Sequence, residues 1–154
     1  MASVIKPWMK NSARVLFFAF IVLSIWVFYN FFVVNRGMEE ISLDKEPLRL
    51  ASTLYFSKMT ALAQLSIALI GGSWAFLSLA GAKVKIVGWP SILCFTVVNT
   101  ALFLSLAVYS YGYDFIVTRI FHHACFDIDA PFIGLVNASQ QLYFLMGCVA
   151  LGVT

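Results

Sequence analysis

Four long apolar runs without an ionised side chain limit this chain more than any other feature of its sequence. They occupy residues 15–34, 60–82, 89–110 and 132–154. About 20 apolar residues suffice for a membrane-spanning helix, because a rise of ~1.5 Å per residue then covers ~30 Å of hydrocarbon. Only helices and closed barrels satisfy their own backbone hydrogen bonds in lipid, and runs this long indicate helices. We therefore predict an all-α polytopic membrane protein, a four-helix transmembrane bundle formed as a single domain by residues 1–154.

The composition excludes several other classes of protein. The 154 residues are 62% hydrophobic and only 11% charged, whereas a soluble domain is about 45–50% apolar and about 25% charged. A net charge of +3 without a clustered basic face does not suit nucleic-acid binding. The expected partners are the lipid bilayer and either a second copy of the chain or another membrane protein, with no nucleic acid.

The first apolar run is expected to remain in the protein as a membrane anchor. Lys6, Lys10 and Arg14 precede it, as in a signal peptide, but its length exceeds that of a signal-peptide core. With the N-terminus inside, five Lys and Arg residues fall on each side of the membrane, and the inner segments hold no acidic residue. Because the first helix usually sets the orientation, we predict that both termini are cytoplasmic and that the protein lies in the plasma or inner membrane.

The connections between the runs differ in kind. The short segment 83–88 predicts an antiparallel hairpin of the second and third helices. Pro47 suits the first turn of a helix, so residues 48–58 are expected to be a helix that continues into the second run. The segment 111–131 is aromatic and mixed, and we interpret it as a connection at the membrane–water interface.

Small and polar side chains gather on one face of the second run and on one face of the fourth. At 100° per residue each set shares one side of its helix, and small residues let membrane helices approach closely. We predict that both faces point into the bundle or a subunit interface, where they serve helix packing or, alternatively, line a pore. The stripe of the second run is Ser57, Ala61, Gln64, Ala68, Gly71, Ala75, Ser78 and Ala82, and that of the fourth is Gly134, Asn137, Ala138, Gln141, Leu145, Cys148 and Gly152.

Five amide side chains lie within the apolar runs, namely Asn30, Gln64, Asn99, Asn137 and Gln141. An unsatisfied amide in hydrocarbon costs several kcal/mol. We therefore expect these amides to face one another, as a hydrogen-bonded network or as a polar vestibule open to one side. The absence of Asp, Glu, Lys, Arg and His from the runs argues against a proton relay or a strongly ion-selective pore.

One segment carries side chains that could bind a metal ion. His122, Cys125 and Asp129 share a face if the segment is helical, and His123, Cys125, Asp127 and Asp129 share one if it is extended. Imidazole, thiolate and carboxylate groups all ligate metals, but this spacing matches no standard motif. We assign no metal, cofactor or catalytic residue, and a pH-responsive surface is an equal alternative.

These observations favour a non-catalytic protein. We expect an interaction or regulatory subunit of a membrane assembly, or a homo-oligomer, rather than an enzyme. A small oligomeric channel or transporter is the first alternative, and an interfacial metal-dependent membrane enzyme is the second. The first run, rich in Trp, Phe and Val nearly all round, is expected to face lipid.

Overall fold

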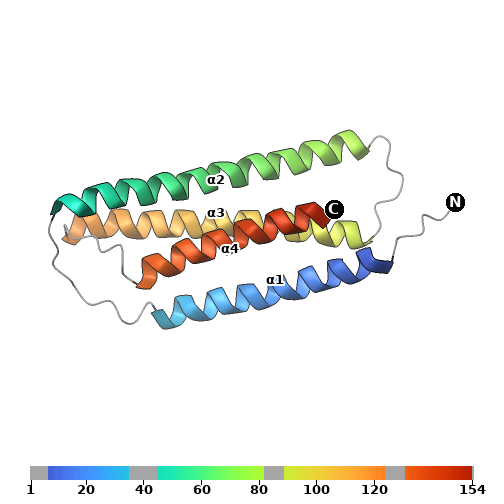
Figure 1. The fold of residues 1–154 in the computed structure, drawn as a ribbon, viewed down its shortest axis with the longest axis horizontal. Coiled ribbons are helices and arrows are strands. Elements are labelled where there is room, and N and C mark those ends of the chain that lie inside the picture. The colour runs from blue at the N-terminus through green and yellow to red at the C-terminus, as the bar shows by residue number, and fades with distance from the viewer. Residues whose placement is uncertain (1–6, 35–44, 82–88, 124–130, 154) are drawn as a thin grey trace.

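The computed structural model describes residues 7–34, 45–81, 89–123 and 131–153, and all of them are helical. Its elements are α1 (Pro7–Val34), α2 (Lys45–Gly81), α3 (Trp89–His123) and α4 (Pro131–Val153). Each helix is long and apolar enough to cross a membrane. The predicted all-α bundle is confirmed: the chain is a multi-pass, membrane-embedded helical protein (Figure 1).

Three helices are longer than their apolar runs, α2 and α3 by the most. α2 begins at Lys45, with Pro47 in its first turn, and continues unbroken to Gly81, which confirms the expected helix over residues 48–58. Its apolar span is Thr53–Ala75 and so begins earlier than residue 60. The third span reaches Thr118, and α3 ends at His123, so most of the expected interfacial connection 111–131 belongs to a helix. The reason is that residues 111–118 hold only one charged side chain, Asp114, and continue the apolar run.

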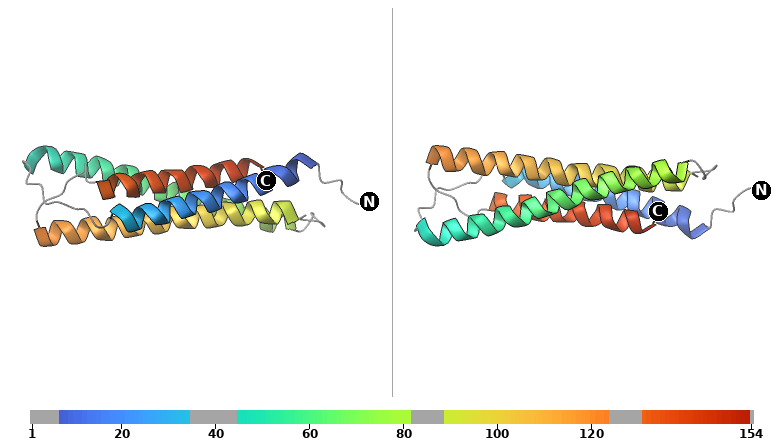
Figure 2. Two further views of the ribbon diagram at one scale, coloured as in Figure 1. Left: turned by 90° about the horizontal axis from the view of Figure 1, so that it is seen from below. Right: turned by 90° about the horizontal axis from the view of Figure 1, so that it is seen from above.

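α3 and α4 form the centre of the bundle. α1 packs against both of them and α2 also contacts both, while α1 and α2 make no contact with each other over the described residues. Figures 1 and 2 show α1 and α2 on opposite sides of the central pair, with α2 and α3 running antiparallel as predicted. α1 begins and α4 ends at the same end of the bundle (Figure 1).

The central pair packs closely because glycines lie at its contacts. A Cβ atom on Gly147 would lie 2.8 Å from the Leu102 side chain, and one on Gly112 would overlap Val136. Leu102 and Val136 are themselves buried. Without large side chains at these two points, α4 approaches α3 closely enough for dispersion contacts to hold the helices together in lipid.

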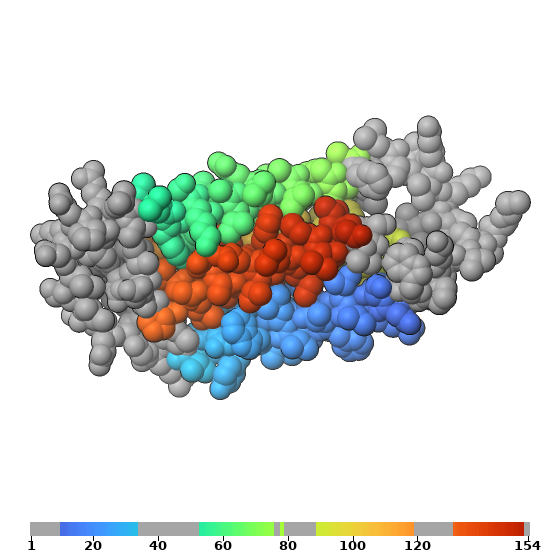
Figure 3. Space-filling model, in the orientation of Figure 1, coloured from blue at the N-terminus to red at the C-terminus, as the bar shows by residue number. Residues whose placement is uncertain are grey.

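α1 has the least buried span. Only 11% of its most apolar window is buried, against 44% for the windows of α3 and α4. Large side chains such as Phe18, Phe28 and Tyr29 lie about two-thirds exposed on it. The first run is therefore the least buried of the four spans, and its contact with lipid stays a prediction. In Figure 3, α4 fills the surface between α1 and α2 on this side of the molecule.

Candidate functional site

The small-residue stripe of α2 points away from the bundle. Among the α2 residues whose burial is described, Met59, Ala63, Ser66 and Ser73 are buried, and the stripe lies on the opposite side of the helix, at 3.6 residues per turn. We call Ser57, Ala61, Gln64, Ala68, Gly71 and Ala75 the α2 small face, and all six residues are exposed.

This placement corrects one alternative of the sequence prediction. The α2 small face does not point into the bundle of a single chain, because α2 packs on α3 and α4 through the opposite stripe, where Met59 fills the contact with Phe132. A Cβ atom on Gly71 would meet nothing within 4 Å. The alternative of a subunit interface stays a prediction.

Gln64 is the residue of this face whose exposure to hydrocarbon would be most unfavourable. It lies in the middle of the span Thr53–Ala75, its side chain is exposed, and it makes no side-chain hydrogen bond within the described part of the chain. A polar amide exposed at this depth would meet hydrocarbon, which offers it neither donor nor acceptor.

The expected network of facing amides is not formed among the described residues. Asn30 Nδ2 donates to the Trp26 carbonyl at 2.7 Å, and Gln141 Nε2 donates to Asn137 Oδ1 at 2.7 Å. Both bonds stay within one helix. Asn30 bonds its own backbone, and Asn137 and Gln141 pair with each other along α4, so neither bond links two helices.

Asn99 is the amide of the five that reaches another helix. Its Nδ2 donates to the Phe95 carbonyl at 2.9 Å, and its Oδ1 accepts a long bond of 3.5 Å from Ser73 Oγ of α2. Asn99 is buried. On α4, however, Gly134 and Leu145 of the predicted inward face are exposed, while Asn137 and Gln141 are half-buried.

The residue that ties three helices together is Gln140, which the sequence prediction missed. Its side chain is fully buried, and its Nε2 donates to the Met59 carbonyl of α2 at 3.0 Å. Ser105 Oγ of α3 donates to the Gln140 carbonyl at 3.1 Å. The signal that could have identified it is the spacing of Val136, Tyr143 and Gly147, at i−4, i+3 and i+7 from Gln140, all of which are buried.

Two tyrosines form further hydrogen bonds that join α2 to α4 and to α3. Tyr55 Oη donates to the Ile133 carbonyl of α4 at 3.1 Å, and Thr60 Oγ1 lies 3.3 Å from Tyr109 Oη of α3. These contacts between helices are therefore held by neutral hydrogen bonds rather than by charges.

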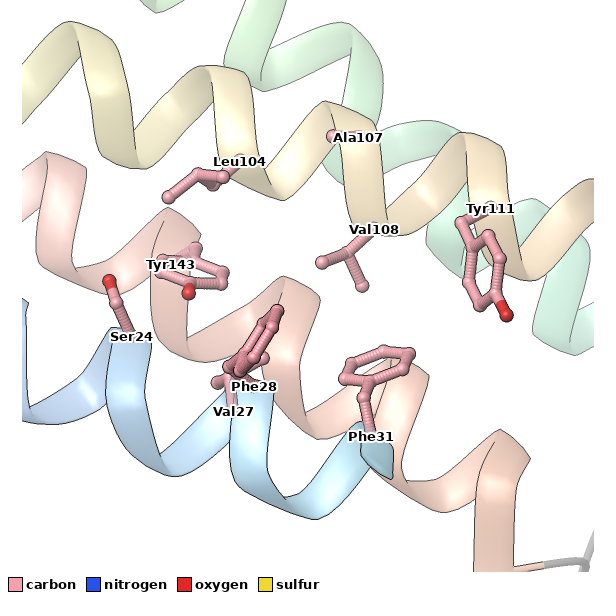
Figure 4. A pocket seen from close by; sticks show the side chains of 9 residues that line it. All are labelled: Ser24, Val27, Phe28, Phe31, Leu104, Ala107, Val108, Tyr111 and Tyr143. Atoms are coloured by element: carbon pink, nitrogen blue, oxygen red, sulfur yellow. The ribbon is translucent and has the colours of Figure 1, made fainter. Parts of the chain in front are cut away.

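A groove lies on the other side of the central pair, between α1 and α3. Its volume is about 360 Å³, and Ser24 of α1 and Tyr143 of α4 line it together with apolar side chains (Figure 4). Ser24 Oγ is buried without a hydrogen-bond partner, and the Tyr143 side chain is only 3% exposed.

The predicted metal-binding alternative falls outside the described residues, because the side chains of His122, His123, Cys125, Asp127 and Asp129 are not among them. Among the described residues no three His, Cys, Asp or Glu side chains come together as a metal site. Cys94 is buried and Cys148 half-buried, both as free thiols.

Comparison with models of known protein families, with curated proteins and with solved structures finds no match to this chain. The geometry of the bundle is therefore the basis of the functional proposal.

Proposed function

We propose that this chain is a non-catalytic subunit of a membrane assembly, in which it associates with a second copy of itself through the α2 small face. The observation that carries the proposal is the exposed amide of Gln64, which has no side-chain partner in the described part of the chain and lies at the middle of a membrane span. A partner helix would remove this amide from hydrocarbon.

The α2 small face suits a second copy because it is self-complementary. Two copies inserted in the same direction place their α2 helices parallel, and a two-fold axis normal to the membrane sets residues near the axis against their own counterparts. An amide carries both donors and an acceptor, so Gln64 can pair with Gln64 of the other copy. Such a bond contributes about 0.6–2 kcal/mol in a membrane.

The shape of the face supports the same proposal. Ala68 and Gly72 are four residues apart, as are Gly71 and Ala75, and both pairs repeat the small-xxx-small spacing of close helix contacts. The exposed Leu65 and Trp74 lie on either side of the small residues, so a parallel helix can approach closely between them.

Cysteine cross-linking in native membranes tests this interface. In a chain whose own cysteines are replaced by Ala, we expect Ala68→Cys to form a disulfide-linked dimer on mild oxidation, because a disulfide needs Cα atoms about 4.4–6.8 Å apart. The control is Val22→Cys, which is exposed on α1 and is expected to stay monomeric. Equal cross-linking at both positions, or none at Ala68→Cys, would contradict the interface.

A bulky substitution on the α2 small face tests the association of two chains without disturbing the fold of one chain. Gly71→Leu should abolish the Ala68→Cys cross-link while the chain keeps its fold, since nothing in the bundle lies near this position. Gly134→Leu is the matched control on α4, where a Cβ atom likewise meets nothing within 4 Å. If a different membrane protein is cross-linked instead, the chain is a subunit but not a homodimer.

We further propose that both termini are cytoplasmic, in a plasma or inner membrane. The support is the inner set of Lys6, Lys10, Arg14, Lys83 and Lys85, which contains no acidic residue. A membrane-impermeant thiol reagent applied to intact cells should label a cysteine added at the C-terminus only after the cells are opened.

A further inference from the structure

The groove between α1 and α3 contains two hydroxyl groups that lack a partner in the described part of the chain. Ser24 Oγ is buried and makes no hydrogen bond. The Tyr143 side chain is 3% exposed, lines the same groove, and has no side-chain hydrogen bond among the described residues. Its ring is packed beside Phe20, with the two ring centres 6.3 Å apart. Figure 4 places both residues toward one end of the groove.

Among the described residues, two buried serine hydroxyls lack a hydrogen-bond partner, Ser24 Oγ in this groove and Ser139 Oγ of α4. Ser66, Ser73 and Thr96 each donate to a carbonyl three or four residues earlier in their own helix, which is the usual way for a hydroxyl to satisfy itself in a membrane helix. Ser24 has the same option on α1 and does not take it. A hydroxyl left unpaired in hydrocarbon is costly, so a group that binds it in this groove stabilises the folded chain.

The rest of the groove is apolar and large enough for a small molecule. Val27, Phe28 and Phe31 of α1 face Leu104, Ala107 and Val108 of α3 around a volume of about 360 Å³. Small-molecule sites usually measure about 300–1,000 Å³ and combine apolar walls with a few polar groups. A second, open hollow lies along α1 alone; it is lined by Ile25, Tyr29 and Phe32 and shares Ser24 and Phe28 with the first.

The depth of the hydroxyls limits what can bind. Ser24 lies near the middle of the span Lys10–Val33, and Tyr143 near the middle of Pro131–Gly152. The ester oxygens and head group of a phospholipid lie at the edge of the hydrocarbon, about 15 Å from its centre. Among the described residues no Asp, Glu, Lys, Arg or His lines the groove, so they offer an ionised ligand no counter-charge.

We propose that this groove binds a neutral, lipid-soluble molecule through one uncharged oxygen, a carbonyl or a hydroxyl, carried on an apolar ring or chain. The oxygen bonds Ser24 Oγ and Tyr143 Oη, and the apolar body lies between Phe28 and Val108. A substituted quinone supplies a carbonyl of this kind, and a sterol supplies a hydroxyl.

Photolabelling of the full chain in phosphatidylcholine nanodiscs tests the site. The probes are an alkyl-benzoquinone and a sterol, each carrying a diazirine, and mass spectrometry locates the label. We expect one of the two probes to label the facing residues of α1 and α3. Unlabelled decylbenzoquinone or cholesterol should then compete at least about tenfold better than decylbenzene, which has the same apolar body as the quinone but no oxygen.

Two variants test the groove itself. Ser24→Ala combined with Tyr143→Phe removes both hydroxyls and little else, and should weaken binding of the probe by about tenfold, the effect of losing two weak hydrogen bonds. Ala107→Phe should exclude the probe by filling the groove. The matched control is Ser78→Ala combined with Tyr113→Phe, which removes the same two groups from positions outside the groove and should leave binding unchanged.

The proposal is overturned if neither probe labels the groove, if decylbenzene competes as well as the oxygen-bearing molecules, or if the double variant without the two hydroxyls binds normally. The last two outcomes would mean that acyl chains of the bilayer fill the groove without recognition.

Discussion

At the scale of single residues, the amide side chains of this chain fall into two groups. Some form hydrogen bonds within their own helix, and others need a partner on another helix. Asn30 and the Asn137–Gln141 pair form hydrogen bonds within their own helices. Gln140 bonds the neighbouring α2, and Gln64 makes no side-chain bond among the described residues. Side chains with the same amide group therefore have different hydrogen-bond partners, and the direction in which each side chain points determines its partner.

Gln64→Leu is expected to weaken self-association by about 3- to 30-fold, because it removes a bond contributing about 0.6–2 kcal/mol between two copies. Energy transfer between labelled copies at increasing dilution in lipid vesicles measures the change. Gln141→Leu is the control, since its amide bonds Asn137 in the same helix and should leave association unaltered. A Gln64→Leu chain that associates like the parent would argue against the α2 small face.

Gln140→Ala is expected to lower the free energy of unfolding by about 2–3 kcal/mol, because it leaves a cavity in a fully buried position and removes the bond to the Met59 carbonyl. Gln141→Ala, at the neighbouring half-buried position, should cost less than about 1 kcal/mol. Reversible unfolding in mixed detergent micelles compares the two variants. Equal costs would show that Gln140 does not hold α4 to α2.

At the scale of the helices, the contact of α3 with α4 depends on the missing side chains of Gly112 and Gly147. Gly147→Ala should destabilise the bundle by about 1–3 kcal/mol, since the new Cβ would lie 2.8 Å from the buried Leu102 and would force the helices apart. Gly134→Ala has open space around it and should be neutral or slightly stabilising. The same unfolding measurement distinguishes them, and a neutral Gly147→Ala would contradict the close approach.

At the scale of the whole molecule, the two central helices are more deeply buried than the two flanking helices. α3 and α4 have 44% of their apolar windows buried, α2 has 17% and α1 has 11%. In hydrogen exchange of the chain in lipid nanodiscs, we expect the backbone amides of α3 and α4 to be the best protected and those of α1 the least, because local opening costs least where the fewest contacts break. Equal protection of α1 and α4 would contradict this order.

The two proposed surfaces use the two flanks in different ways. The α2 small face presents an amide and small residues to a second copy, on the side away from α3 and α4. The groove beside α1 presents two hydroxyls to a small molecule. Because α1 and α2 lie on opposite sides of the central pair (Figure 2), one surface can be occupied without blocking the other.

The sequence by itself determined that the chain crosses a membrane four times as helices, because each apolar run is long enough to span hydrocarbon and a run of this length satisfies its own backbone there as a helix. It also determined the continuous helix that begins near Pro47 and the exposed character of α1. These properties are local, since they depend on the length and composition of one segment at a time.

Only the tertiary structure decided which side of each helix is buried. In water an apolar stripe identifies the inner face of a helix, but in lipid the outer face is apolar too, so small or polar residues are a weaker guide. The α2 small face and Gln64 point outward, and Ser66 and Met59 point inward, because Met59 rather than the small residues fits against Phe132. The same packing buried Gln140 between α2 and α3 and brought Ser24 beside Tyr143, two arrangements that depend on how separate helices fit together in space.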